Sequence, residues 1–107
     1  MLKKKNRADK NAVEEIFKKG RFLNSLNLTF KYIKTNGSAI KISFIAPKSV
    51  AKLAVKRNFL RRKGYNLLKK YIGQFPVGVT GAFVFKKYQD DASILENEIK
   101  SILGKIN

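Results

Sequence analysis

The sequence lacks several residue types on which many enzymes depend. Its 107 residues include no cysteine and no histidine, and its 7 acidic residues lie towards the two ends, with none between Ile16 and Gln89. Disulfides, thiolate metal sites and the usual His or Cys catalytic groups are therefore excluded. A metal cluster would have to be built from carboxylates near the termini. If the protein takes part in a reaction, we expect another molecule to supply the reactive groups.

Long apolar runs are also missing. No segment approaches the roughly 18 consecutive apolar residues that span a bilayer, and no hydrophobic stretch follows the basic N-terminus. We therefore expect a protein that is neither secreted nor inserted in a membrane and that is located in the cytoplasm, a reducing compartment that suits a chain without cysteine. The length predicts one domain with a modest core, over residues 11–107, preceded by a basic N-terminal arm at residues 1–10.

Positive charge dominates what is present. The chain has 24 Lys and Arg against 7 Asp and Glu, which gives a formal net charge of +17. A domain with this field attracts polyanions at long range and binds them by releasing counterions, so its affinity is expected to fall steeply with salt. The composition thus points to a nucleic-acid partner.

The segment from Lys52 to Tyr71 is predicted to form a helix with two faces. An apolar stripe is spaced for burial along one side: Leu53, Leu60, Gly64, Leu67 and Tyr71. The adjacent face carries a polar set at intervals of about one turn: Arg57, Asn58, Arg61, Arg62, Tyr65 and Lys69. Like charges at this spacing cost helix stability, and no acid is present to pair with them. A polyanion explains this face better than solvation does, because guanidinium forks match phosphate oxygens, and Asn and Tyr can bond or stack on nucleotides.

Periodicity predicts the remaining elements. A first helix runs from Asn11 to Lys19, with Asn11 and Glu14 spaced as a capping box and Gly20 ending it. Strands are predicted at residues 21–23, 26–34, 39–46 and 79–86. A last helix begins near Ser93, with Ser93 and Glu96 as its capping box, and its buried stripe is Leu95, Ile99, Ile102, Leu103 and Ile106. The order α-β-β-β-α-β-α predicts a small α+β sandwich.

Asn36-Gly37 predicts a two-residue hairpin turn between the two long strands. With this turn Ile33 would face Ile40, and the apolar residues of the two strands would fall on opposite faces of the sheet. The residues concerned are Leu28, Phe30 and Tyr32 on one strand and Ile40, Ile42 and Phe44 on the other. Either a bulge resets the pairing or both faces of the sheet are partly covered.

The central segment resembles the Arg-Asn-Arg helix of the bacterial ribonuclease P protein family. The usual pattern there is Ala-Val-x-Arg-Asn-Arg-x-Lys-Arg-x-x-Arg-Glu, and this sequence reads Ala54-Val55-Lys56-Arg57-Asn58-Phe59-Leu60-Arg61-Arg62. It departs from the pattern at Phe59 and where the trailing Arg-Glu is Tyr65-Asn66. The first helix also resembles that of the family, which reads roughly Phe-x-x-Val-Phe-x-x-Gly, with Val13 in place of the first Phe and with Phe17 and Gly20 matching.

This resemblance extends from about residue 6 to the end of the chain. It implies a fold of the ribosomal protein S5 domain 2-like type, with a left-handed β-α-β crossover around the central helix. It also implies the function of a ribonuclease P protein subunit, which helps to remove the 5′ leader from precursor tRNA while the RNA subunit catalyses the reaction with bound Mg²⁺. The implied partners are ribonuclease P RNA and precursor tRNA, and the implied state is a monomer within the ribonucleoprotein.

The residues and the resemblance together suggest two RNA-binding groups, with no catalytic or metal-binding side chain. The catalytic RNA would contact the central helix and the residue before it: Lys52, Lys56, Arg57, Asn58, Arg61, Arg62 and Tyr65. The single-stranded leader would contact a cleft between the first helix and the sheet, formed by Val13, Phe17, Lys31 and Tyr32. Phe17 is either an exposed stacking residue or an ordinary core residue, and it is open which of Thr29, Lys31 and Tyr32 touches RNA. Lys48 and Lys52 form either a phosphate site before the helix or a solvated loop.

Two other classes of function remain open. The first is a ribosomal or other structural RNA-binding protein with no role in cleavage. The second is a non-specific DNA-compacting protein, which would need a dimer surface or DNA-bending arms that the sequence does not show. The motif argues against both, because a generic basic domain has no reason to place Asn58 inside an arginine cluster.

Overall fold

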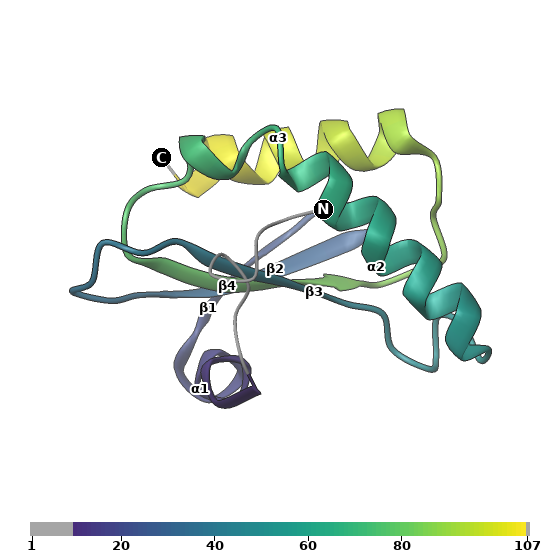
Figure 1. Ribbon diagram of the computed structural model, residues 1–107, viewed down its shortest axis with the longest axis horizontal. Coiled ribbons are helices and arrows are strands. Elements are labelled where there is room, and N and C mark those ends of the chain that lie inside the picture. Colours follow the sequence, from purple (N-terminus) through teal and green to yellow (C-terminus); the bar gives the residue numbers. More distant parts are fainter. Residues whose placement is uncertain (1–9, 107) are drawn as a thin grey trace.

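The computed structural model describes residues 10–106 as one mixed four-stranded sheet with helices on both faces (Figure 1). In chain order the elements are α1 (Lys10–Lys19), β1 (Arg21–Asn24), β2 (Leu28–Lys34), β3 (Lys41–Ile45), α2 (Ala54–Leu68), the 3₁₀ helix η2 (Ile72–Gln74), β4 (Val79–Phe85) and α3 (Ala92–Ile106). The predicted α+β class and element order are confirmed. The predicted arm lies outside the described residues, apart from Lys10, which begins α1.

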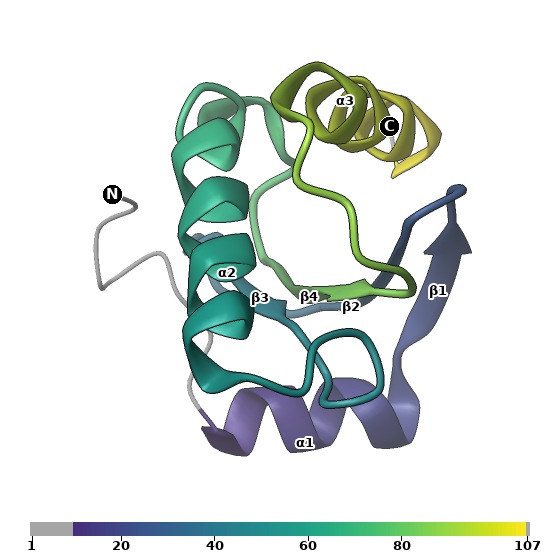
Figure 2. The same ribbon diagram turned by 90° about the vertical axis from the view of Figure 1, so that its right-hand side faces the viewer.

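The helices form two unequal layers. Helices α2 and α3 pack on one face of the sheet, and α1 lies against the other (Figures 1 and 2). The main core fills the space beneath α2 and α3, and its fully or almost fully buried members include Leu28, Phe30, Ile42, Phe44, Leu60, Leu68, Phe83, Ile99 and Ile102. Helix α1 contributes the fully buried Ile16 and contacts β2 and β4. No helix within residues 10–106 has the length and apolarity to cross a membrane.

The predicted hairpin between the two long strands is wrong. The strand order is β1-β2-β4-β3, so β4 lies between β2 and β3, antiparallel to β2 and parallel to β3. Phe30, Phe83 and Phe44 are therefore cross-strand neighbours on one face, with ring centroids 4.4 Å and 4.9 Å apart. This arrangement puts the apolar residues of β2 and β3 on the same face without a bulge, although α1 does cover part of the other face.

The turns at one end of the sheet are joined by a close backbone contact. Among the described residues only Gly78 has a positive φ, of 82°, and Gly37 does not adopt the conformation that a type I′ turn requires. The Thr35 N–H donates to the Gly78 carbonyl at 2.8 Å, and a Cβ on Gly78 would lie 2.5 Å from the Thr35 oxygen. The Asn36-Gly37 segment thus leads the chain from β2 to β3, which is not the neighbour of β2 in the sheet. The turn before β4 places β4 between these two strands.

The crossover from β3 through α2 to β4 joins two adjacent parallel strands, as the resemblance implies. Its left-handed sense stays an expectation. Helix α2 crosses the sheet at Gly64, where a Cβ would lie 2.5 Å from a ring carbon of Phe44. Glycine is required there because the helix and the ring approach too closely for any side chain.

The predicted stripe of α2 is correct in its centre and wrong at its start. Leu60, Gly64 and Leu67 are buried, whereas Leu53 precedes the helix and is 62% exposed. Tyr71 follows the helix, is half-buried, and its hydroxyl donates to Glu96 Oε2 at 2.5 Å. Helix α2 begins at Ala54, later than expected, because Leu53 has an extended conformation and is its N-cap residue.

Both predicted capping boxes are wrong. Asn11 lies inside α1, which begins at Lys10. In α3 the capping residue is Asp91, whose Oδ1 accepts the Ile94 N–H at 3.0 Å, two residues before the expected Ser93. Glu96 therefore does not cap the helix. Its carboxylate accepts a hydrogen bond from the Tyr71 hydroxyl and lies 3.7 Å from the Lys70 ammonium.

A buried carboxylate ties α3 to the turn between β1 and β2. Glu98 is 9% exposed and accepts hydrogen bonds from the Ser25 hydroxyl, the Asn27 backbone N–H at 2.7 Å and the Asn27 amide at 2.7 Å. Burial alone would raise the pKa of Glu98, but these donors and backbone hydrogen bonding from Leu28 together hold its pKa below the usual 4.5. Glu98 is therefore an ionised carboxylate in the folded protein at neutral pH.

The orientation of α2 predicts unequal effects for two leucines. Leu60→Ala should lower the free energy of unfolding by about 2–5 kcal/mol, because it opens a cavity in the core. Leu53→Ala, the matched control, should change it by less than about 0.5 kcal/mol, because Leu53 is exposed. Chemical denaturation measures both, and equal losses would contradict the orientation.

The Glu98 network predicts a pH dependence of stability. The pKa of Glu98 is lower in the folded protein than its usual value. The stabilisation that the Glu98 carboxylate provides is therefore complete above the usual carboxyl pKa, and it is lost as the pH falls through the lower pKa of the folded state. Glu98→Gln should cost about 1–3 kcal/mol at neutral pH, because the Gln amide brings an NH₂ group against existing donors. The difference between the two proteins should shrink below about pH 4.5. If the difference in the free energy of unfolding between the two proteins stays constant down to pH 3, a group other than Glu98 causes the pH dependence.

Candidate nucleic-acid interface

The N-terminal part of α2 and the residue before it present the α2 basic surface, which consists of Lys52, Lys56, Arg57, Asn58, Arg61 and Arg62. Four of these side chains are exposed, while Arg57 and Arg61 are half-buried. The two salt bridges found within the described part of the chain, Glu15–Lys19 and Lys70–Glu96, involve none of them. The predicted cations are thus brought together on one surface and keep their charge available for a polyanion.

Arg57 also has a structural task that the sequence did not reveal. Its Nη1 donates to the backbone carbonyls of Ala51 at 3.0 Å and Lys52 at 2.8 Å. The turn before it is closed by the Val50 and Ala51 N–H groups, which both donate to the Pro47 carbonyl. Arg57 therefore holds in place the segment that carries the exposed Lys48 and Lys52, whose role as a phosphate site stays a prediction.

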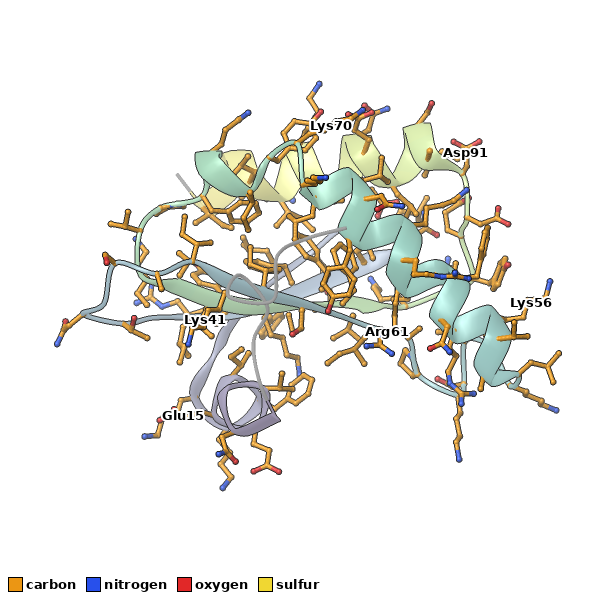
Figure 3. All side chains as sticks on the ribbon, in the orientation of Figure 1. Glu15, Lys41, Lys56, Arg61, Lys70 and Asp91 are labelled. Carbon is orange, nitrogen blue, oxygen red and sulfur yellow. The ribbon has the colours of Figure 1, made fainter. Side chains whose placement is uncertain are left out.

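Arg61 and Asn58 are neighbours on the helix surface. Arg61 Nη1 donates to Asn58 Oδ1 at 3.4 Å. This bond uses the oxygen of the Asn58 amide and neither of its two N–H donors. Figure 3 shows Arg61 projecting from α2 towards the side of the sheet on which α1 lies, while Lys56 points outwards near the start of the helix. The surface thus offers donors in more than one direction.

The prediction that Tyr65 contacts RNA is wrong for this structure. Tyr65 is 2% exposed, its hydroxyl accepts the Phe44 N–H at 3.1 Å, and its ring packs edge-on against the Phe44 ring at 5.3 Å. The hydroxyl thus binds an N–H of β3, which is an edge strand of the sheet. The i, i+4 spacing suggested a continuation of the arginine row, but the helix has reached the sheet by residue 65.

A second group of side chains lies on the face of the sheet that α1 covers in part. Phe17 on α1 is 46% exposed, which resolves its role in favour of a surface residue, and the Lys31 ammonium lies 4.8 Å from its ring centroid. Lys31 is directly paired across the strands with Phe22 of β1, whose side chain is 63% exposed. We call these three residues the Phe17–Lys31–Phe22 platform.

Phe22 is the residue of this site that the sequence analysis missed. Strand β1 has only four residues, Arg21–Asn24, so it offers little alternation from which to assign faces. The structure assigns its face through its neighbour: Leu23 packs on the main core, so Phe22 points to the opposite face.

Tyr32 does not belong to this face, so the structure does not bring it together with Phe17 and Lys31. It lies two residues after Phe30 on β2, packs on the main core, and stacks on the Phe30 ring at 5.5 Å. Val13 is half-buried on α1, and the Thr29 hydroxyl donates to Asn24 Oδ1 at 2.7 Å. Of the predicted leader set, Phe17 and Lys31 meet, Val13 is on the same helix as Phe17, and Tyr32 is across the sheet.

The platform combines two exposed rings with one ammonium. Rings can stack on unpaired bases, and an ammonium between them can bind a phosphate. Glu15 of α1 forms a salt bridge with Lys19 at 3.7 Å and lies on the side of α1 away from α2 (Figure 3). No three His, Cys, Asp or Glu residues within the described ranges come together as a metal site. The charges and rings of these two surfaces suit a polyanion with unpaired bases.

Comparisons with known proteins agree with this geometry. A family model described as Ribonuclease P matches residues 2–107. The chain is similar to the RNase P protein from Thermotoga maritima, with a TM-score of 0.78, 18% identity, and coverage of 88% of this chain and 90% of that one. It is also similar to the Staphylococcus aureus RNase P protein, with a TM-score of 0.80, 16% identity, and coverage of 95% and 98%. At these identities the two structures show a shared fold. No curated protein matches the sequence.

The α2 basic surface predicts a salt-dependent effect on RNA binding. Replacing both Arg61 and Arg62 with Ala should weaken binding to a folded RNA and reduce the salt slope by up to about 2, roughly 1 for each lost phosphate contact. Fluorescence anisotropy of a labelled RNA at several salt concentrations measures this slope.

A matched control is Lys34→Ala with Lys100→Ala, which removes the same charge from exposed sites on β2 and α3. An equal loss of affinity and slope in the control would show that only total charge matters. The circular dichroism spectrum should be unchanged in both double variants.

Proposed function

The chain belongs to the ribonuclease P protein family, and on that premise we propose that it is the protein subunit of a ribonuclease P holoenzyme. It binds the catalytic RNA subunit and the 5′ leader of precursor tRNA, and so promotes endonucleolytic removal of the leader. The protein works as a monomer within the ribonucleoprotein, in the cytoplasm. The observation that carries the proposal is the family match over residues 2–107, almost the whole chain.

The two surfaces suit the two RNA partners for different physical reasons. A folded catalytic RNA presents closely spaced phosphates, and the α2 basic surface offers guanidinium forks and ammonium groups for them. A leader is single-stranded, and the Phe17–Lys31–Phe22 platform offers rings for its unstacked bases. Because α2 and α1 lie on opposite faces of the sheet, the protein can contact both partners at once (Figure 2).

Mg²⁺ bound by the RNA subunit supplies the chemistry in this proposal, by activating water and stabilising the leaving oxygen. The fit to this chain is indirect, since the residues that the structure describes offer no cluster of carboxylates to hold the ion. The contribution of the chain is electrostatic. Its cations reduce the repulsion between the phosphates of the catalytic RNA and those of the precursor, so that the two RNAs can approach at lower Mg²⁺ concentrations.

Cleavage of a precursor tRNA tests the proposal. A bacterial ribonuclease P RNA is assayed at low Mg²⁺ with and without the protein, and the 5′ end of the product is mapped. We expect the protein to increase kcat/KM for cleavage at the mature 5′ end. Tight, salt-dependent binding to that RNA without any stimulation would instead favour a structural RNA-binding protein.

The platform gives this assay a sharper form. Replacing Phe17 and Phe22 with Ala should lower kcat/KM for a precursor with a long leader by about five- to a hundredfold, because one or two stacked bases lose their rings. A precursor with a one-nucleotide leader should be cleaved equally well by both proteins, since it does not reach the platform. Val77→Ala, which removes an exposed apolar side chain elsewhere, is the control. Equal losses on both precursors would contradict a leader-binding role for the platform.

A further inference from the structure

The outward face of α2 carries an aromatic side chain that does not belong to the core. Phe59 is 38% exposed. It lies five residues before Gly64, which faces the sheet, so its side chain points roughly 140° around the helix from that contact. Val55, one turn earlier, is exposed on the same side of the helix. Phe59 and Val55 thus form a small apolar patch on a helix face that is otherwise polar.

The ring of Phe59 is held beside a fixed cation. The Lys63 ammonium lies 5.0 Å from the ring centroid and also donates to the backbone carbonyl of Asp90 at 2.8 Å. The segment after β4 therefore anchors the ammonium over the ring, and it carries a second exposed ring, Tyr88. The Tyr88 hydroxyl lies 3.5 Å from Asp90 Oδ2. This group is separate from Arg57 and Arg61, which leave the helix in other directions.

The surroundings of Phe59 favour a nucleic acid over a protein. Every charged side chain on α2 is basic, and Arg62 and Lys63 follow Phe59 at three and four residues, on the same side of the helix. Of the acids in the nearby segment, Asp91 is engaged in capping α3 through its Oδ1. A second copy of the chain would bring a further formal charge of +17 against this surface. An unpaired base can stack on the ring while flanking phosphates bind the cations.

We propose that Phe59 is a stacking site for an unpaired base of the catalytic RNA, with Lys63 and Arg62 binding the flanking phosphates. The inference rests on the function proposed above and deepens it, since it adds a contact on the outer face of α2. The family pattern has arginine at this position, so this chain replaces a charged, salt-sensitive side chain with a ring whose contact does not depend on salt.

The absence of tryptophan from the chain allows a direct test. Phe59→Trp introduces a single Trp, whose fluorescence should be quenched when a base stacks on it. Bacterial ribonuclease P RNA is titrated into this variant, while anisotropy of the labelled RNA reports binding independently. We expect quenching that saturates together with the anisotropy. Val77→Trp, at the exposed turn before β4, is the matched control and should change little.

A salt series separates stacking from charge. Phe59→Ala should weaken binding to the same RNA by about five- to a hundredfold while leaving the salt slope unchanged. Lys63→Ala should instead lower the slope by up to about 1. A reduced slope in Phe59→Ala, or affinity equal to that of the parent protein, would overturn the stacking site.

The failures of the two proposals are distinguishable. If the unmodified protein does not bind ribonuclease P RNA, the proposed function fails. If it binds that RNA and stimulates cleavage, but the emission of Phe59→Trp stays unchanged at saturation, only the stacking site is wrong. If sedimentation shows a dimer that Phe59→Ala converts to a monomer, the ring is a protein contact, and the stacking site is again wrong.

Discussion

The arrangement of the α2 basic surface depends on the contact between Phe44 of β3 and the middle of α2. The Phe44 ring occupies the space where Gly64 has no side chain, and its N–H is bound by the Tyr65 hydroxyl. This contact holds α2 across the sheet at one point, and burial of Leu60 and Leu68 on either side fixes the rotation of the helix about its axis. The rotation decides which side chains reach solvent. Arg62 and Phe59 are exposed, and Tyr65 is removed from the row of RNA contacts, because Gly64 must face the ring.

The second constraint is electrostatic. A chain with a formal charge of +17 and no acid between residues 16 and 89 must fold against its own repulsion. The few acids are used where they help the fold: Glu98 ties α3 to the turn before β2, Asp91 caps α3, and Glu96 joins α3 to Tyr71 and Lys70. Within residues 10–106, no acid forms a salt bridge with the cations of the α2 basic surface. The fold thus leaves a large positive potential on this surface, while Asp91, Glu96 and Glu98 hold α3 in place.

The sequence predicted the order of elements, the apolar centre of α2 and the basic surface, because these depend on periodicity and composition within single segments. It failed where the answer depends on neighbours in space. The Asn36-Gly37 turn suggested a hairpin, but the Phe30, Phe83 and Phe44 rings pack together only when β4 lies between β2 and β3. Tyr65 and Tyr32 looked like binding residues because the sequence shows their residue type, and a tyrosine suits RNA contacts. Their burial depends on how the helix and the sheet pack, which the sequence does not show. Phe22 was missed because four residues of strand do not define a face.

The central claim is that the two faces of this protein bind two different RNAs in one complex. A photo-crosslinking amino acid placed at position 17 on α1, or at position 62 on α2, tests it most directly in the holoenzyme assembled with precursor tRNA. We predict that the probe at position 17 cross-links to the 5′ leader and that the probe at position 62 cross-links to the catalytic RNA. Cross-links from both positions to the same RNA would contradict the account.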